Sequence, residues 1–187
     1  PMSLPLDFIL ESERLRLRAP ASRDLPHIFT AAQYPGFTDG MLWDPPKEMD
    51  ELIPSLERSI ERWERGIGYN FNIDRKADES FVGRISIRQT DEESVWNVGF
   101  WTHPESQGQG IMSEALASVL DFAFGELLAT SVEAEYATWN LASERVLQKN
   151  GFQFVKHIEL GFQKHGTWHA ENRVRILRRN WLARQKA

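Results

Sequence analysis

Two glycines between a predicted strand and a predicted helix are the part of the sequence best suited to chemistry. They are Gly108 and Gly110, in the run Gln107-Gly108-Gln109-Gly110-Ile111-Met112-Ser113. Glycine has no Cβ, so this backbone can approach a ligand closely. The following helix directs its unpaired N–H groups and the positive end of its dipole at the same place, which favours a phosphate. The run therefore predicts an anion-binding loop, and the competing interpretation is a tight turn that needs glycine for its backbone alone.

Three nucleotide-binding motifs could account for this loop. A P-loop ends in Gly-Lys-Ser/Thr, and this loop has no lysine. A dinucleotide fingerprint needs a third glycine where Ser113 stands, and it follows the first strand of a βαβ unit, whereas at least three strand-like runs precede this loop. The third motif fits best: the stretch resembles the Q/R-x-x-G-x-G/A loop of the GCN5-related N-acetyltransferases (GNAT). Met112 departs from it, because Gly or Ala is usual there. Within the family, the wording Gly-Gln-Gly-Ile-Met-Ser resembles the RimJ/RimL type, whose RimL members acetylate protein α-amino groups.

The resemblance implies a ligand and a fold. In this family the loop amides hold the pyrophosphate of acetyl-coenzyme A, which assigns that role to Gln107, Gly108, Gln109, Gly110, Ile111, Met112 and Ser113. The family fold is mixed α/β, with a mostly antiparallel central sheet that splays between its fourth and fifth strands and is flanked by helices. The pantetheine arm lies in that splay. Phe100, Trp101 and Thr102, on the strand before the loop, are therefore the expected backbone partners.

A second motif begins about 30 residues after the loop. Asn140-x-x-Ser143, followed by a helix that ends in Lys149-Asn150-Gly151-Phe152, resembles the Asn-x-x-Ser … Gly-Phe pattern of the same family. By analogy Asn140 contributes to the coenzyme site and to catalysis, and Ser143 protonates the departing thiolate. The alternative is structural, because Asn140 is a good helix N-cap, Gly151 is a good C-cap, and Ser143 is a first-turn hydroxyl.

The absence of cysteine constrains the mechanism. The chain has no Cys, so an acyl group cannot pass through an enzyme thioester, and direct transfer from donor to amine is the default unless a serine acts as nucleophile. The general base is left open. Asn97 stands where the family often has a carboxylate, and Ala170 replaces a second acid, with Glu171 beside it. His103 and His169 have suitable ordinary pKa values, although lone histidines are more often structural.

The elements that must position these residues follow from residue patterns. Period-2 alternation or apolar runs predict strands over 13–18, 69–74, 81–89, 95–102, 131–138, 152–160 and 168–177. Helical spacing predicts helices over 25–33, 48–65, 115–124 and 139–149. The strand at 131–138 follows a helical crossover, so we expect it to run parallel to 95–102. The link 161–166 is expected to be turn-rich, and the arginines from Arg173 to Arg184 are expected to form a solvated strand face and tail.

A loop is predicted for residues 34–47, because the segment is rich in proline and glycine. It is unusually apolar for a loop. Phe37, Met41 and Trp43 are therefore the expected substrate-binding residues, either in a lid that packs on the core or in the wall of an acceptor pocket, which the same region forms in the resembling family.

Composition excludes several functional classes. The chain has 187 residues and a formal net charge of −5, which does not favour non-specific binding of nucleic acid. No apolar run of membrane-spanning length and no signal peptide is visible, and the lack of cysteine fits the cytoplasm. Pro1 precedes Met2, so we expect Pro1 to be an expression scar and residues 2–187 to form a single acetyltransferase domain.

The sequence thus predicts an acetyl-coenzyme A-dependent N-acetyltransferase without a metal, either a monomer or a homodimer. The expected acceptor is the α-amino group of a protein or peptide N-terminus, as in ribosomal-protein serine/alanine acetyltransferases. The open alternatives are an enzyme for a small amine or an antibiotic-like molecule, a non-catalytic acyl-coenzyme A-binding module, and a dinucleotide-binding module.

Overall fold

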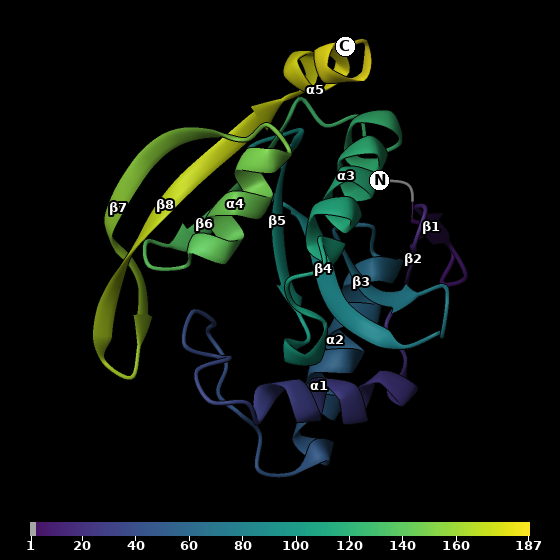
Figure 1. Ribbon diagram of the computed structural model, residues 1–187, viewed down its shortest axis with the longest axis vertical. Helices are drawn as coiled ribbons and strands as arrows, with labels where there is room; N and C mark the ends of the chain where they lie inside the picture. The colour runs from purple at the N-terminus through teal and green to yellow at the C-terminus, as the bar shows by residue number, and fades with distance from the viewer. Residues whose placement is uncertain (1–2) are drawn as a thin grey trace.

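One twisted sheet of eight strands organises the chain in the computed structural model, which describes residues 3–187 (Figure 1). The expectation about Pro1 and Met2 lies outside these residues. The strands are β1 Ile9–Glu11, β2 Leu15–Arg18, β3 Gly68–Arg75, β4 Phe81–Gln89, β5 Val95–Thr102, β6 Ser131–Ala137, β7 Gln153–Lys164 and β8 Thr167–Leu177. Their order is β1-β2-β3-β4-β5-β6-β8-β7, and every neighbouring pair is antiparallel except β5–β6. The mixed α/β fold and the parallel β5–β6 pair are confirmed.

In the view of Figure 1, α3 and α4 lie in front of this sheet, α1 and α2 lie below it, and α5 lies at the top. Their bounds are α1 Leu25–Ala32, α2 Ile53–Glu64, α3 Ile111–Gly125, α4 Leu141–Lys149 and α5 Arg178–Gln185, with short 3₁₀ turns at Ser22–Asp24, Met49–Leu52 and Pro104–Ser106. The predicted helix 48–65 begins as one of these 3₁₀ turns and becomes α-helical at Ile53. Pro54 has no N–H to continue an α-helical ladder backwards, so it suits only the first turn. Within the described part of the chain, no helix has the length and apolar character that a bilayer crossing requires.

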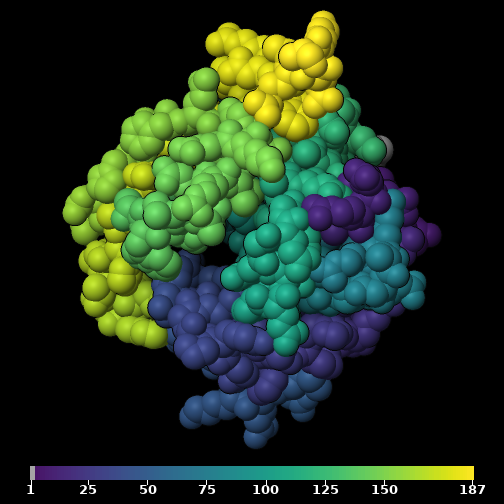
Figure 2. All heavy atoms as spheres, in the orientation of Figure 1, coloured from purple at the N-terminus to yellow at the C-terminus, as the bar shows by residue number. Residues whose placement is uncertain are grey.

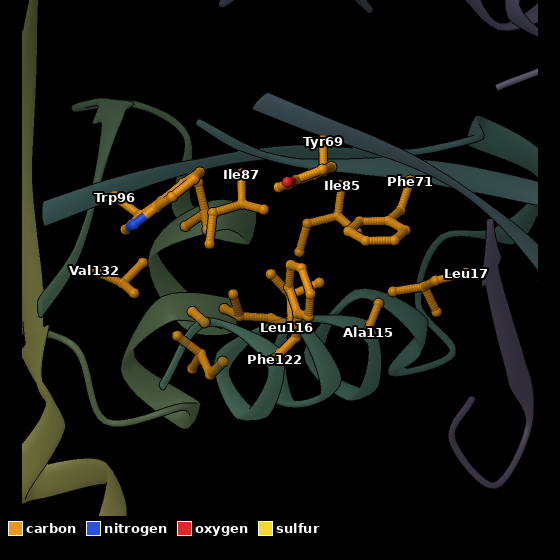
Figure 3. Packing of buried hydrophobic residues seen from close by; sticks show 14 of the residues in the cluster. Leu17, Tyr69, Phe71, Ile85, Ile87, Trp96, Ala115, Leu116, Phe122 and Val132 are labelled. Atoms are coloured by element: carbon orange, nitrogen blue, oxygen red, sulfur yellow. The ribbon is translucent and has the colours of Figure 1, made fainter. Parts of the chain in front are cut away.

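The main core fills the space between α3 and the sheet (Figure 3). Ala115, Leu116 and Phe122 of α3 face Tyr69 and Phe71 of β3, along with buried side chains of β2, β4, β5 and β6. Completely burying one such large apolar side chain contributes about 1.5–3 kcal/mol, so this layer fixes α3 against the sheet. The glycine loop, at the N-terminus of α3, is thereby held at the end of β5.

Three sequence predictions about the edges and ends of the fold were wrong or incomplete. Strand β1 was missed because it has only three residues and no clear alternation. The expected turn-rich link 161–166 is mostly strand, and the turn itself is only His165–Gly166. Gly161 is needed for close approach, since a Cβ there would lie 2.3 Å from Cγ of Glu171. The expected tail forms helix α5, which is anchored by buried Trp181.

Candidate active site

The glycine loop, residues 107–113, adopts a backbone that requires its glycines. Gly108 and Gly110 have φ of +77° and +72°, in the left-handed region that side chains with a Cβ rarely enter. Gly110 is the N-cap of α3, and Ile111, Met112 and Ser113 form the first turn of that helix. A Cβ added at Gly108 would meet no atom within 4 Å, and at Gly110 it would meet only the Arg14 guanidinium at 3.6 Å. The space in front of the loop is therefore open.

The amides of this loop are available to a ligand. Within residues 3–187, the N–H groups of Gly108, Gln109 and Gly110 donate no hydrogen bond to protein. The dipole of α3 adds a partial positive charge at the same place. Free amides at a helix N-terminus suit a phosphate group, so this part of the chain fits the pyrophosphate of acetyl-coenzyme A.

Two arginines and a carboxylate brace the loop: Arg14 just before β2, Arg75 at the end of β3, and Glu114 in α3. Arg14 donates to Glu114 Oε1 (2.7 Å) and to the carbonyl oxygen of Gln109 (2.9 Å), and Arg75 donates to Gln109 Oε1 (2.7 Å). Burial acts to raise the pKa of Glu114, but hydrogen bonds from Ser12 and Arg14 outweigh it and leave that pKa lowered. Glu114 therefore stays ionised, and the two cations stay beside the open face of the loop. The sequence prediction did not include either arginine, because each lies far from the loop in the chain.

The sheet opens next to this loop. Strands β5 and β6 pair only over Val95–Asn97 and Ser131–Glu133, so the rest of β5, including Phe100, Trp101 and Thr102, has no β6 partner. On its other edge that stretch pairs with β4. The predicted splay is thus present. The strands predicted as the fourth and fifth are β5 and β6, because the structure adds β1 before them. Figure 2 shows a hollow in this face, bounded by the green α4 region, the teal segment before α3 and the blue 34–47 segment.

Helix α4 presents Asn140 and Ser143 at its N-terminus. Asn140 is the N-cap, and its Oδ1 accepts a hydrogen bond from the Ser143 amide (3.2 Å). The structural role of Asn140 is therefore established by geometry, and its predicted contact with the coenzyme stays a prediction. The hydroxyl of half-buried Ser143 has no hydrogen-bond partner in the described residues, which leaves it free to donate a proton.

Three glutamates line the polar face of β6 and β8. Asn97 donates to Glu135 Oε2 (2.6 Å), Arg173 pairs with Glu135 (3.1 Å), and Arg175 pairs with Glu133 (2.9 Å). The expectation of a solvated arginine face was therefore wrong for Arg173 and Arg175, because both are partly buried ion-pair partners.

Glu171 differs from the other two glutamates. It is opposite Ala137 in the β6–β8 register, two pairs along from Arg173 and Glu135 and therefore on the same face of the sheet. No side chain in the described residues donates a hydrogen bond to its carboxylate. Burial, and secondarily the negative charge of Glu135, raise the pKa of Glu171. A carboxylate with a raised pKa and free oxygens has the properties of a general base.

The two histidines considered as bases have structural surroundings. His103 is buried, and its Nδ1 accepts from the Glu105 amide (3.2 Å) as the N-cap of the 3₁₀ turn Pro104–Ser106. Burial lowers the pKa of His103. His169 stacks on Phe162 near the end of the β7–β8 hairpin, with 5.1 Å between ring centroids. Among residues 3–187, no group of three or more His, Asp or Glu side chains could hold a metal ion.

The 34–47 segment is an ordered, aromatic-rich loop. The Phe37 ring lies edge-on to Trp101 (5.3 Å between centroids) and to Trp43 (6.4 Å). Trp43 lines a cavity of about 520 Å³ between α1, α2 and the sheet, whereas neither Phe37 nor Met41 does. At the far end, Lys164 Nζ donates to the carbonyl oxygens of Thr38, Met41 (3.0 Å) and Trp43 (3.1 Å). The segment is thus tied to the β7–β8 hairpin.

Comparison with known proteins decides the family. The family profile for the acetyltransferase (GNAT) domain matches residues 14–153. The chain belongs to the GNAT acetyltransferases. The predicted enzyme class, an N-acetyltransferase, is that of the family, and the resemblance drawn from the glycine loop is confirmed.

Individual relatives agree with this assignment. The probable N-acetyltransferase YjcK of Bacillus subtilis is 32% identical over 119 residues, which are 63% of this chain and 66% of YjcK. A structure of RimL, a ribosomal L7/L12 α-N-protein acetyltransferase in complex with coenzyme A, has a TM-score of 0.82 at 20% identity, covering 91% of this chain and 98% of that one. A spermidine N-acetyltransferase from Vibrio cholerae, in complex with coenzyme A and spermine, has a TM-score of 0.78 at 20% identity, covering 91% and 99%. One GNAT fold therefore serves different amine acceptors.

Proposed function

We propose that this GNAT protein transfers the acetyl group of acetyl-coenzyme A directly to the α-amino group of a protein or peptide N-terminus. One observation carries the coenzyme part. The stretch of β5 that has lost its β6 partner runs directly into a glycine loop whose amides are free. An extended arm beside β5 and an anionic group at the loop can be parts of one ligand. We also propose that the chain acts as a single domain, because one sheet connects β1 to β8.

The chemistry needs one proton acceptor and one proton donor. The cosubstrate supplies a thioester carbonyl, at which a nitrogen–carbon bond forms and the carbon–sulfur bond breaks. We assign Glu171 to take the proton that the amine loses, directly or through a water molecule, because its carboxylate is free and its pKa is raised. Ser143 gives a proton to the departing thiolate, and Asn140 positions Ser143 by holding the start of α4.

The preference for an α-amine rests on proton energetics and on shape. An α-amine has a pKa near 8 and lysine near 10.4, so deprotonation at neutral pH costs roughly 1 kcal/mol for the first and roughly 4–5 kcal/mol for the second. A carboxylate is a weak base, so it suits an α-amine better than a lysine side chain. The aromatic contacts among Phe37, Trp43 and Trp101 provide an apolar wall for an N-terminal residue. RimL, with a similar fold, is named for acetylation of a ribosomal protein at its α-nitrogen, which makes ribosomal-protein N-termini suitable first acceptors to test.

Thiol release from acetyl-coenzyme A tests this function. The panel contains a lysine-free peptide with a free N-terminus, an N-blocked peptide with one lysine, and spermidine. We expect the highest kcat/KM for the free N-terminus. Faster turnover of spermidine would favour the small-amine alternative, and thiol release with none of the acceptors, despite coenzyme binding, would favour the non-catalytic module.

Direct transfer has its own test. Mass spectrometry of the protein after incubation with acetyl-coenzyme A alone should show no stable acetyl adduct, because the chain has no cysteine. A stoichiometric adduct on Ser143 would instead indicate a covalent intermediate.

A further inference from the structure

The cavity beside Trp43 contains a cation that the proposed chemistry does not use. Arg84 of β4 lines this cavity together with Asn72 of β3, apolar side chains of α1 and α2, and Trp43. Arg84 Nε donates to Asn72 Oδ1 (2.9 Å), and its guanidinium carbon lies 5.8 Å from the centroid of the Trp101 ring. Within residues 3–187, Arg84 donates no other hydrogen bond and forms no ion pair. Its terminal N–H groups are therefore available to a guest in this cavity.

Asp24, the acid whose charge acts on Arg84, is already engaged. Arg18 donates to both Asp24 oxygens (2.7 and 2.9 Å) and to both Asp74 oxygens (2.6 and 3.0 Å). Asn72 Nδ2 also donates to Asp24 Oδ2 (2.6 Å), so the amide stands between that carboxylate and Arg84. Burial lowers the pKa of Arg84 to about 10, and the charge of Asp24 only partly offsets this effect. Arg84 is thus a desolvated cation that a further anion would stabilise.

The remaining charges around the cavity also favour an anionic guest. Glu51 accepts from the backbone amides of Lys47 and Glu48, and Asp44 pairs with His165 (2.7 Å). The side chains of Lys47 and Arg58 line the cavity, and neither has an ion-pair partner in the described residues. Both acids thus have partners, whereas Arg84, Lys47 and Arg58 have no ion-pair partner among residues 3–187.

The cavity is also close to the splay. Arg84 is paired with Trp101 in the β4–β5 register, and Trp101 belongs to the part of β5 that has no β6 partner. Neighbouring strands lie about 4.8 Å apart, and an extended peptide advances about 3.3 Å per residue. One to two residues therefore separate an amine at the splay from a group at Arg84.

We propose that Arg84 binds a carboxylate of the acceptor, so that the preferred substrate is a peptide with a free N-terminus and Asp or Glu at its second residue. This inference rests on the proposed N-terminal acetyltransferase activity and specifies its substrate class. A guanidinium matches the planar carboxylate with two parallel hydrogen bonds, and it is more weakly hydrated than an ammonium, which favours ion pairs at partly buried sites.

The experiment compares two lysine-free, C-terminally amidated peptides that begin with Ser-Glu and Ser-Gln and are otherwise identical. Because charge-assisted hydrogen bonds are stronger than neutral ones, the Glu peptide should have a kcat/KM about 10-fold or more above that of the Gln peptide. Arg84→Gln should equalise the two peptides, mainly by reducing the rate with Glu. Arg88→Gln is the matched control, since Arg88 is on the same strand but is exposed and lies outside the cavity.

A melting curve of each variant separates binding from folding. If Arg84→Gln does not fold, Arg84→Lys retains the charge but loses the bidentate geometry, and it should show a reduced preference for Glu. Equal rates with both peptides in the unmodified protein, or a preference that persists in Arg84→Gln and is unchanged in Arg84→Lys, would overturn the proposal.

A separate measurement applies if neither peptide is acetylated, which would contradict the proposed function. Calorimetry with N-acetyl-Ser-Glu-amide and N-acetyl-Ser-Gln-amide then tests the cavity directly. Tighter binding of the Glu compound that is lost in Arg84→Gln would support the carboxylate site on its own, and equal affinities would exclude it.

Discussion

Asn150, at the end of α4, donates from Nδ2 to the carbonyl oxygen (3.2 Å) and to the hydroxyl oxygen (3.3 Å) of Ser113 in the first turn of α3. The same amide also reaches the Val146 carbonyl oxygen (3.1 Å), and its side chain is buried. The end of α4, the helix of the second motif, is thus fixed to the start of α3, the helix that follows the glycine loop. This contact gives a physical reason for the two motifs to occur together.

Replacing Asn150 tests that link. Asn150→Ala removes the donor that three partly buried acceptors on Ser113 and Val146 share, so the free energy of unfolding should fall by about 1–3 kcal/mol. Coenzyme A affinity should also fall, because the first turn of α3 loses its support. Urea denaturation and calorimetry measure the two effects, with Lys149→Ala as the control at the exposed neighbouring position. A variant as stable as that control would show that the contact is dispensable.

The glycine loop makes the sharpest prediction about the coenzyme. Gly110→Asp adds a Cβ at φ +72° and a negative charge where phosphates are expected. Coenzyme A affinity should fall by at least about tenfold, because backbone strain and repulsion between the new carboxylate and the phosphates together cost more than about 1.4 kcal/mol of binding free energy. Gly110→Ala, which adds strain without charge, should show a smaller loss. Unchanged affinity in calorimetry, with native circular dichroism, would rule out this loop as the phosphate site.

The backbone of the glycine loop and the start of α4 could be predicted from the sequence because their determinants are local. Two glycines before a helix, and an Asn N-cap before another helix, act within a few residues of themselves. The splay could be anticipated only through the family, because it depends on how far two strands remain paired. Edge strand β1 and helix α5 were missed since each is short, and α5 buries little besides Trp181.

The acceptor side was predictable only in outline. Segment 34–47 could be recognised as an apolar loop, but its connection to Lys164 spans more than 120 residues of sequence. Similarly, the sequence has Asn97 where the family often has a carboxylate, but the fold places Glu135 Oε2 2.6 Å from Asn97 Nδ2. Contacts between residues on different strands depend on the pairing register, and no single stretch of sequence specifies that register.

Glu171 should control the acidic side of the pH–rate profile. Its pKa is raised by burial and by Glu135, and the base must be ionised, so kcat/KM should rise with pH through a value above the ordinary one for glutamate. Glu171→Gln should lower kcat strongly and remove this inflection.

The contribution of Glu171 to stability should change with pH in the opposite direction to the rate. The folded state holds the Glu171 proton more tightly than the unfolded state, so this group's contribution to the free energy of unfolding decreases as pH rises through the folded pKa. At neutral pH the Gln variant should therefore be no less stable. A less stable variant with an unchanged pH profile would indicate a structural role.

Trp43 should affect only the acceptor. It lines the cavity and meets Phe37, whereas the glycine loop lies elsewhere. Trp43→Ala should raise KM for a peptide with a free N-terminus about tenfold or more, as expected for loss of a buried aromatic contact, and leave KM for acetyl-coenzyme A nearly unchanged. Equal damage to both KM values would mean that the segment also supports the coenzyme site.

Lys164 should determine how firmly the 34–47 segment holds its shape. Its side chain is only 10% exposed, and its ammonium donates to carbonyl oxygens of Thr38, Met41 and Trp43 while lying 3.6 Å from Asp44 Oδ1. Lys164→Met keeps the length of the side chain but leaves those carbonyls without their donor, so the segment should open more often. We expect a higher KM for the peptide acceptor, an unchanged KM for acetyl-coenzyme A, and faster amide hydrogen exchange confined to 34–47. Lys156→Met, at an exposed position on the same strand, is the control. Unaltered exchange in Lys164→Met would show that the aromatic contacts of Phe37 alone hold the segment, and in that case the peptide KM should not change either.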